Sequence, residues 1–175
     1  MHLNYRQFLH YNPASATLDN ILLITPNEGL TEQHIEEMTA SNIPCRRFDL
    51  NDSGLALGER NRVRVIEITK LVEEKRGGGL SVPVEAFEGN NLIFVDEGHK
   101  GAGGDAWRGY RDALGQTGFT FEYSATFGQA LTAARNDALT AEYGNAIVFD
   151  YSYRYFHGDG YGKDFRIMNL REETT

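Results

Sequence analysis

Two short, uninterrupted apolar runs constrain the fold of this 175-residue chain most strongly, at residues 21–24 (ILLI) and 92–95 (LIFV). Each is as long as one β-strand and far shorter than the roughly 20 apolar residues of a membrane-spanning helix. A strand without alternating polar positions is typical of a parallel sheet whose two faces are both covered. The two runs therefore predict a soluble α/β protein built around a buried sheet.

Strand-like and helix-like stretches alternate along the rest of the chain. We predict helices over 31–39, 105–115 and 128–143, and further strands over 46–50, 63–71, 119–123 and 146–149. Thr31 and Asp105 are the expected N-caps of the first two helices, and Gly115 is the expected end of the second. Strands that alternate with helices indicate a mainly parallel sheet, in which ligands bind beyond the carboxyl ends of the strands.

The composition fits one domain and excludes several kinds of site. Acidic residues outnumber basic ones by 25 to 17, and the net charge of −8 argues against a stand-alone basic nucleic-acid binder. It does not exclude a module that makes a few contacts to a strand. Cys45 is the only cysteine, so the chain can form neither an internal disulfide nor a cysteine-rich zinc site. Residues 1–6 show no signal-peptide pattern, so we expect a cytoplasmic protein without a membrane partner.

Residues capable of chemistry follow the strand predicted at 92–95. Asp96 and Glu97 come directly after it, and His99 follows Gly98. Adjacent acids at the end of a buried strand need solvent, a cation or hydrogen-bond donors. Asp96 could hold a magnesium ion on nucleotide phosphates through water, and Glu97 could take the proton of an attacking water. An ordinary polar turn is an equally good explanation of these residues taken alone.

Two other predicted strands end in similar polar residues. Ser124 and Thr126 follow the strand at 119–123, where such a pair is most often a helix N-cap. Thr25 ends the run at 21–24, and a turn of Asn27, Glu28 and Gly29 comes next. The ordinary explanation of that segment is a turn followed by a capped helix.

In this order, the three strand ends resemble the first motor domain of superfamily 2 helicases. Residues 25–34 resemble motif Ia, 96–99 motif II in its DExH form, and 124–126 motif III. The similarity is stronger to the restriction subunit of type III restriction enzymes and related DEAD/DEAH-box proteins, and it extends to 107–108, 121–130, 149–153 and 160–164. The resemblance implies a RecA-like, three-layer α/β/α fold. It implies a first motor domain over 1–150 and a segment leading toward the second motor domain over 151–175.

The resemblance also implies a hydrolytic site for ATP and magnesium. Asp96 would hold the magnesium ion through water, Glu97 would activate the attacking water, and His99 would couple the nucleotide state to neighbouring groups. Ser124 and Thr126 would link hydrolysis to domain movement. The function that follows is part of an ATP-dependent helicase or translocase.

The resemblance implies that residues in the segment similar to motif Ia contact nucleic acid. The residues concerned are Thr25, Asn27, Glu28 and Gly29. Duplex DNA is the expected partner of the full-length parent. Hydroxyl and backbone amide contacts to phosphates need no basic patch, so the charge of −8 is compatible with this partner.

The phosphate loop of the family is missing from the sequence. No G-x-x-x-x-G-K-S/T occurs, and the Gly-rich stretches at 100–105 and 158–163 have the wrong order or spacing. Residues 1–11 resemble the helix that follows Walker A, so the chain looks like a motor domain truncated at its N-terminus. Because phosphoryl transfer depends on positioning and charge, we expect this chain alone neither to bind ATP tightly nor to hydrolyse it. ATP, magnesium and the remaining motor domains would belong to the full-length parent.

The missing loop has a structural consequence. In the resembled fold the Walker A strand lies between the motif III strand and the last strand, so we expect an incomplete sheet with a gap. The last strand, an N-terminal segment or self-association with another copy would fill that gap, because unpaired backbone groups are costly.

Other interpretations stay open. A non-catalytic nucleic-acid or protein interaction domain that retains the motor fold is the alternative to the motor. The five histidines do not favour zinc, because cysteine ligands and an H-x-x-x-H spacing are absent. Aromatic residues at 151, 153, 155 and 156 could stack on bases, but half-buried packing beside a strand is favoured. Arginines at 60, 62 and 64 fit a solvated strand edge better than a phosphate site.

Overall fold

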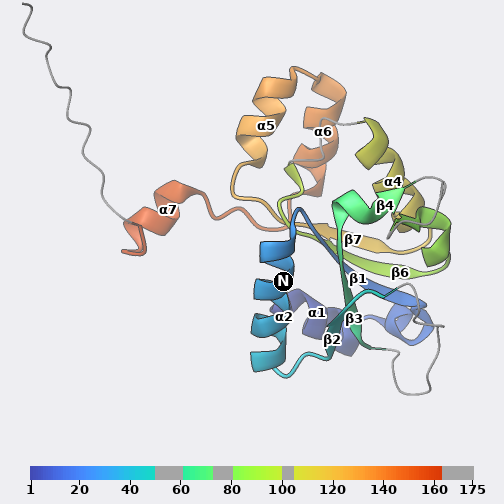
Figure 1. Ribbon diagram of the computed structural model, residues 1–175. Helices are drawn as coiled ribbons and strands as arrows, with labels where there is room; N and C mark the ends of the chain where they lie inside the picture. Colours follow the sequence, from blue (N-terminus) through green and yellow to red (C-terminus); the bar gives the residue numbers. More distant parts are fainter. Residues whose placement is uncertain (50–60, 73–80, 100–104, 163–175) are drawn as a thin grey trace, which may run out of the picture. The chain divides into compact units, whose positions relative to one another are not determined.

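The computed structural model describes residues 1–49, 61–72, 81–99 and 105–162. The chain divides into two compact units, Met1–Arg135 and Asn136–Thr175. The first unit is a mixed α/β structure with a five-stranded, all-parallel sheet flanked by helices (Figure 1). The predicted α/β class and the parallel sheet are therefore confirmed.

The helices and strands alternate along the first unit as expected. In chain order they are α1 (His2–Tyr11), η1 (Pro13–Thr17), β1 (Asn20–Thr25), α2 (Glu28–Ala40), β2 (Cys45–Arg47), β3 (Val63–Glu67), η2 (Ile68–Lys70), β4 (Leu71–Val72), β5 (Val82–Pro83), η3 (Val84–Phe87), β6 (Asn91–Val95), α4 (Asp105–Gly115), β7 (Phe119–Glu122) and α5 (Phe127–Ala134). The second unit contains α6 (Asp137–Ala146) and α7 (Tyr153–Gly158).

The main sheet has the strand order β2-β3-β1-β6-β7. Its centre is β1, in which Ile21 lies opposite Val63 of β3 and Leu92 of β6. Both apolar runs thus form strands that are buried on both faces, as the sequence predicted. The strands β4 and β5 form a separate, two-stranded parallel sheet.

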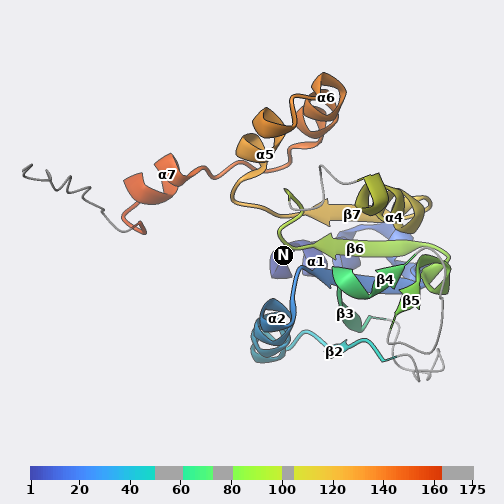
Figure 2. The same cartoon turned by 45° about the horizontal axis from the view of Figure 1, so that its top comes forward.

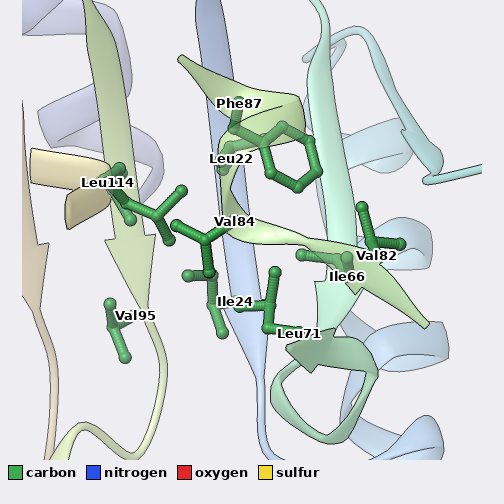
Figure 3. Packing of buried hydrophobic residues seen from close by; sticks show 10 residues of the cluster. Leu22, Ile24, Ile66, Leu71, Val82, Val84, Phe87, Val95 and Leu114 are labelled. Atoms are coloured by element: carbon green, nitrogen blue, oxygen red, sulfur yellow. The ribbon is translucent and has the colours of Figure 1, made fainter. Parts of the chain in front are cut away.

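Two apolar clusters hold the first unit together, one on each face of the main sheet. Successive side chains of a strand point to opposite faces, so Leu22 and Ile24 join one cluster while Ile21 and Leu23 join the other. The first cluster is covered by residues of η2, β4, β5 and η3 and by Leu114 of α4 (Figure 3). Residues from α1 and α2 cover the second. Burial of each of these large apolar side chains contributes about 1.5–3 kcal/mol, so the centre of the sheet dominates the stability.

The predicted N-cap of α2 at Thr31 is wrong. The helix begins one turn earlier, because Asn27 has an extended backbone and its side-chain oxygen accepts a hydrogen bond from the Leu30 N–H at 3.0 Å. Thr31 lies buried inside the helix. The predicted bounds of the next helix agree with the structure, because α4 runs from Asp105 to Gly115.

Two predicted elements are longer than the observed ones. The strand expected over 63–71 ends at Glu67, because Ile68–Lys70 form a 3-10 turn that leads into β4. The strand expected over 46–50 is β2, and residue 50 lies outside the described residues. The Gly-rich stretch at 100–104 and residues 163–175 lie outside them as well.

The single helix predicted over 128–143 is in fact two helices. Arg135 ends α5 in the left-handed region, with a φ of 51°. Asn136 then caps α6, since its side-chain oxygen accepts a hydrogen bond from the Leu139 N–H at 3.0 Å. An alanine-rich composition favours helix on both sides but does not reveal the break, which the Arg-Asn pair produces.

The last predicted strand, at 146–149, is wrong. Ala146 ends α6, and Ile147, Val148 and Phe149 lie outside any helix or strand with exposed fractions of 66%, 81% and 80%. An apolar run forms a strand only where a neighbouring strand accepts its backbone hydrogen bonds. The main sheet is continuous in the described part of the chain and ends at β7, so the expected internal gap is absent.

The aromatic segment after this run also differs from the prediction. Tyr151, Tyr153, Tyr155 and Phe156 are exposed, with fractions between 38% and 58%, and the described residues of the second unit, 136–162, contain no strand. Half-buried packing beside a strand is therefore wrong for these residues. Their rings contact one another instead, as between Tyr151 and Phe156, whose centroids lie 6.2 Å apart.

Candidate functional site

Polar residues gather where the parallel strands end. The arrowheads of β6 and β7 lie at the same edge of the sheet (Figure 2). Thr25 ends β1, Asp96 follows β6, and Ser124 comes shortly after β7. The structure therefore brings together the three strand ends that the sequence singled out.

The turn after β6 is fixed to both neighbouring strands by its backbone. The Asp96 N–H donates to the carbonyl of Ile24 at 2.9 Å, and the Gly98 N–H donates to the carbonyl of Tyr123 at 3.0 Å. Between them, Glu97 has a φ of 54°, in the left-handed region that is sparsely populated by residues other than glycine. Such backbone strain persists where surrounding contacts impose it, and it often marks a functional site.

The left-handed turn aims the Glu97 carboxylate at His99. The distance from Glu97 Oε2 to His99 Nδ1 is 3.1 Å. The Asp96 carboxylate supports the turn from the other side, since its Oδ1 accepts a hydrogen bond from the Glu97 N–H at 3.0 Å. Both acids therefore have defined partners in the turn that joins β6 to the following segment.

His99 joins this turn to the end of β7. Its Nδ1 lies 2.7 Å from the Ser124 hydroxyl oxygen, which also accepts a hydrogen bond from the Thr126 N–H at 3.0 Å. The hydroxyls of Ser124 and Thr126 lie 3.5 Å apart. Five of the predicted site residues, Asp96, Glu97, His99, Ser124 and Thr126, therefore form one contiguous polar cluster.

This cluster differs from a nucleophilic Ser-His-acid relay. In such a relay the serine contacts one ring nitrogen of the histidine and the acid contacts the other. Here Ser124 and Glu97 both contact Nδ1 of His99. Only one proton can occupy that nitrogen, so the histidine connects two strand ends and does not pass a proton between its ring nitrogens.

His34, which is not among the predicted site residues, contacts the same cluster. Its Nε2 lies 2.9 Å from Oδ2 of Asp96, and its side chain is only 13% exposed. The other ring nitrogen, Nδ1, is buried without a hydrogen-bond partner in the described part of the chain. The signal that could have identified His34 is its position two turns after Asn27, on the same face of the helix.

The donor set fits a magnesium ion held through water. Magnesium usually retains several waters and takes one or two protein carboxylates. Asp96 presents one carboxylate at the edge of the sheet, with Oδ1 bonded to a backbone amide and Oδ2 beside His34. A directly coordinated ion with several protein ligands fits less well, because the described residues contain no group of three or more His, Cys, Asp or Glu side chains that could hold a metal.

The residues predicted to contact nucleic acid lie at or near the adjoining strand end, and three of them make structural contacts. The Thr25 hydroxyl is buried and lies 2.6 Å from that of Thr31. Asn27 caps α2, and the Glu28 carboxylate receives the Arg47 guanidinium at 3.4 Å. Gly29 lies in the first turn of the helix. The nucleic-acid contact predicted for these residues stays a prediction.

A network of ion pairs lies where β2 and β3 end, at the same edge of the sheet. Arg47 of β2 contacts Glu28, Glu32 and Glu67, and the carboxylate of Glu67 also receives Lys70 at 2.6 Å. The hydrogen bond to Glu32 and the surrounding carboxylates raise the pKa of Arg47. Glu67 ends β3 with its side chain only 8% exposed, so these two cations compensate a nearly buried charge.

Tyr123 links the site to the N-terminal helix. Its hydroxyl accepts a hydrogen bond from the side-chain amide of Asn4 in α1 at 2.7 Å. Burial raises the pKa of Tyr123 to about 12, although the Asn4 hydrogen bond opposes this shift. Because Tyr123 immediately precedes Ser124, packing of α1 helps to position the hydroxyl that contacts His99.

Comparisons with protein-family models, with curated proteins and with solved structures found no match for this chain. Among the helices of the described residues, none is both long enough and apolar enough to cross a membrane.

Proposed function

We propose that this chain is part of a nucleic-acid-dependent ATPase motor of the DExH type, similar to the restriction subunit of type III restriction enzymes. The observation that carries the proposal is the 2.7 Å contact between His99 and Ser124. This contact joins the turn that resembles motif II to the segment that resembles motif III. Such a connection is needed if ATP hydrolysis is to drive movement of the motor domains. A RecA-like fold is part of the proposal, supported by the parallel sheet and the position of the three motifs at its carboxyl edge.

Each residue of the cluster has a distinct part in the proposed reaction. Asp96 holds the magnesium ion of ATP through water, and the ion neutralises charge on the phosphates. Glu97 accepts the proton of the attacking water, a step for which its carboxylate is accessible, since the side chain is 34% exposed. His99 contacts Glu97 and Ser124 together, so a change at the phosphates can reach the segment of Ser124 and Thr126.

The nucleic-acid partner of the proposed motor is duplex DNA. The backbone of the turn at Asn27–Gly29 is the element that would meet a phosphate, because the Thr25 hydroxyl is buried against Thr31. A backbone amide contact of this kind positions the strand without reading its sequence.

A fusion experiment tests the proposed ATPase. A segment with an apolar strand and a G-x-x-x-x-G-K-T loop is placed ahead of Met1, and ATP binding and hydrolysis are measured with and without magnesium. We expect both activities in the fused chain and neither in the chain alone. In the fused chain, Glu97→Gln should lower turnover by about 100-fold or more while ATP still binds, because only the general base is lost.

Glu88→Gln is the matched control, since it removes an exposed carboxylate outside the cluster. It should leave turnover unchanged. A fused chain that fails to bind ATP would contradict the motor assignment. Magnesium-dependent hydrolysis by the unfused chain that Glu97→Gln abolishes would contradict the expectation that this chain alone is inactive.

One observation favours the alternative, an interaction domain that retains the motor fold. In the second unit, aromatic and aliphatic side chains are exposed along one continuous segment, 147–161. Tyrosine and phenylalanine are enriched where proteins bind one another. ATP-independent binding of a partner through this segment by the fused chain would favour this alternative.

A further inference from the structure

His34 joins α2 to the turn that follows β6, although 62 positions separate it from Asp96 in the sequence. Its Nε2 lies 2.9 Å from Oδ2 of Asp96, and the two side chains are only 13% and 20% exposed. Water therefore competes little for this hydrogen bond, which makes it stronger than the same contact on an open surface. The carboxylate of Asp96 is thus held by a side chain from a different element.

The contact defines which ring nitrogen of His34 donates. An ionised carboxylate oxygen only accepts hydrogen bonds, so a proton lies on Nε2 and points at Oδ2 of Asp96. The other nitrogen, Nδ1, is buried and has no hydrogen-bond partner in the described part of the chain. A buried nitrogen without a partner is unfavourable, so packing alone does not account for a polar ring at this position. What the imidazole contributes here is its Nε2–H.

Two hydrogen bonds together fix the plane of the Asp96 carboxylate. Rotation of a carboxylate about its Cβ–Cγ bond has a broad energy minimum, so a single contact does not select one orientation. The Glu97 N–H donates to Oδ1 at 3.0 Å, but this donor belongs to the same turn and moves with it. The His34 donor comes from another element, and it fixes the orientation of the carboxylate relative to α2.

The helix that carries His34 is itself held at the end of β1. Thr31 lies one turn before His34 on the same face of α2, and its buried hydroxyl lies 2.6 Å from that of Thr25. The Asp96 N–H donates to the carbonyl of Ile24, the neighbour of Thr25 in β1. Both ends of the contact between His34 and Asp96 are therefore fixed to the same strand, which gives the contact a defined geometry.

We propose that His34 is a positioning residue for Asp96, whose carboxylate it holds in the orientation that binds the water shell of magnesium. This role rests on the proposed function, in which Asp96 holds the magnesium ion of ATP. Removal of a group that hydrogen-bonds to a metal-binding carboxylate typically changes metal affinity or activity by about 10- to 100-fold. His34 touches neither ATP nor the ion in this role, because it acts through Asp96.

NMR spectroscopy of the full, unfused chain tests the contact itself. Long-range 1H–15N correlations of ring-labelled histidine report which nitrogen carries a proton, and His34→Gln assigns the signals of His34 by their loss. We expect a proton on Nε2, and Asp96→Ala should make it exchange with water about tenfold faster, because the hydrogen bond to a charged group is lost. A proton on Nδ1 alone, or an exchange rate that Asp96→Ala leaves unchanged, would overturn the proposal.

The magnesium dependence of the fused chain tests the role of His34. His34→Leu removes the donor, and it should raise the magnesium concentration for half-maximal ATP hydrolysis about tenfold. His34→Gln places an amide N–H near the position of Nε2, so it should restore most of the affinity for magnesium. His2→Leu is the matched control, because His2 also contacts a side-chain oxygen, the Ser41 hydroxyl at 3.1 Å, at the other end of α2. It should leave the magnesium dependence unchanged.

The results against this proposal differ from failure of the motor assignment. If ATP still binds, then a magnesium dependence that is unchanged in His34→Leu, or is altered equally in His34→Leu and His34→Gln, would overturn the positioning role. A fused chain that binds no ATP would instead contradict the proposed function. Because the position of the ring proton is measured on the unchanged chain, that result decides the contact even if a substitution prevents folding.

Discussion

The two edges of the main sheet are built in different ways. β2 is three residues long, follows Pro44 and carries Arg46 and Arg47. β7 consists of aromatic residues, a threonine and one acid that is paired with α4. One edge has the features that prevent further pairing, and the other lacks them. The comparison shows that, within the described residues, charge and a preceding proline protect the β2 edge, whereas the β7 edge is built mainly from aromatic side chains.

The two edges are also fixed to the core by different forces. At β2, Arg47 is held by three carboxylates, of which Glu67 is nearly buried. At β7, the rings of Phe119 and Phe121 pack against Phe8 of α1, with centroids 6.0 and 6.5 Å away. A buried ion pair requires a defined geometry, whereas aromatic packing contributes mainly buried apolar area. Three substitutions separate these contributions.

The largest effect is expected at the β2 edge. Arg47→Ala leaves Glu67 with Lys70 as its remaining cation and leaves Glu28 and Glu32 without this partner. Because the nearly buried Glu67 then keeps only one of its two cations, we expect the free energy of unfolding to fall by about 3 kcal/mol, the low end of the loss when a buried ion pair is broken. Urea denaturation measures this change. Arg154→Ala, at an exposed arginine of α7, is the control, and an equal loss there would contradict the special role of the network.

A smaller effect is expected at the β7 edge. Phe8→Ala removes the ring that packs on both phenylalanines of this strand, and we expect a loss of about 2 kcal/mol, since Phe8 is only partly buried. Amide hydrogen exchange should quicken in β7 more than in β2. Tyr11→Ala, on an exposed position of the same helix, should cost far less. An equal increase in the exchange rate of β2 and β7 would show that α1 does not stabilise β7.

At neutral pH the smallest effect is expected at Tyr123, and it changes as the pH rises. The folded state raises the pKa of this phenol to about 12, so above pH 10 the unfolded state loses its proton first. Stability due to the neutral phenol is therefore present below about pH 10 and is lost as pH rises toward 12, by at most about 1.4 kcal/mol per pH unit. Urea denaturation across this range should show a shallower decline for Tyr123→Phe.

The companion substitution Asn4→Ala tests whether the buried phenol or its hydrogen bond causes this pH dependence. It removes the donor to Tyr123 but keeps the buried hydroxyl, so it should retain the decline above pH 10. If Tyr123→Phe declines as steeply as the unchanged chain, then burial of this phenol does not contribute to the alkaline loss of stability.

Much of the site could be predicted because it depends on local sequence. Asp96 and Ser124 each follow a strongly apolar or aromatic strand, and parallel strands bring such endings to one edge. The contact of His34 with Asp96 could not be predicted in the same way, since it depends on how α2 packs against β1 and β6. The structural use of Thr25 and Glu28 likewise depends on Thr31 and Arg47, which are distant in sequence or on another element.

By itself, the sequence determined the α/β class, the two central strands and the polar residues at their ends, because apolar runs and turn residues act over a few positions. Only the tertiary structure decided which apolar runs became strands. The run at 92–95 has β1 and β7 on either side and is a strand, whereas the run at 146–149 has no strand beside it among the described residues of its own unit and is exposed. A strand needs partners for its backbone hydrogen bonds, and the chain's own sequence does not say where those partners will lie.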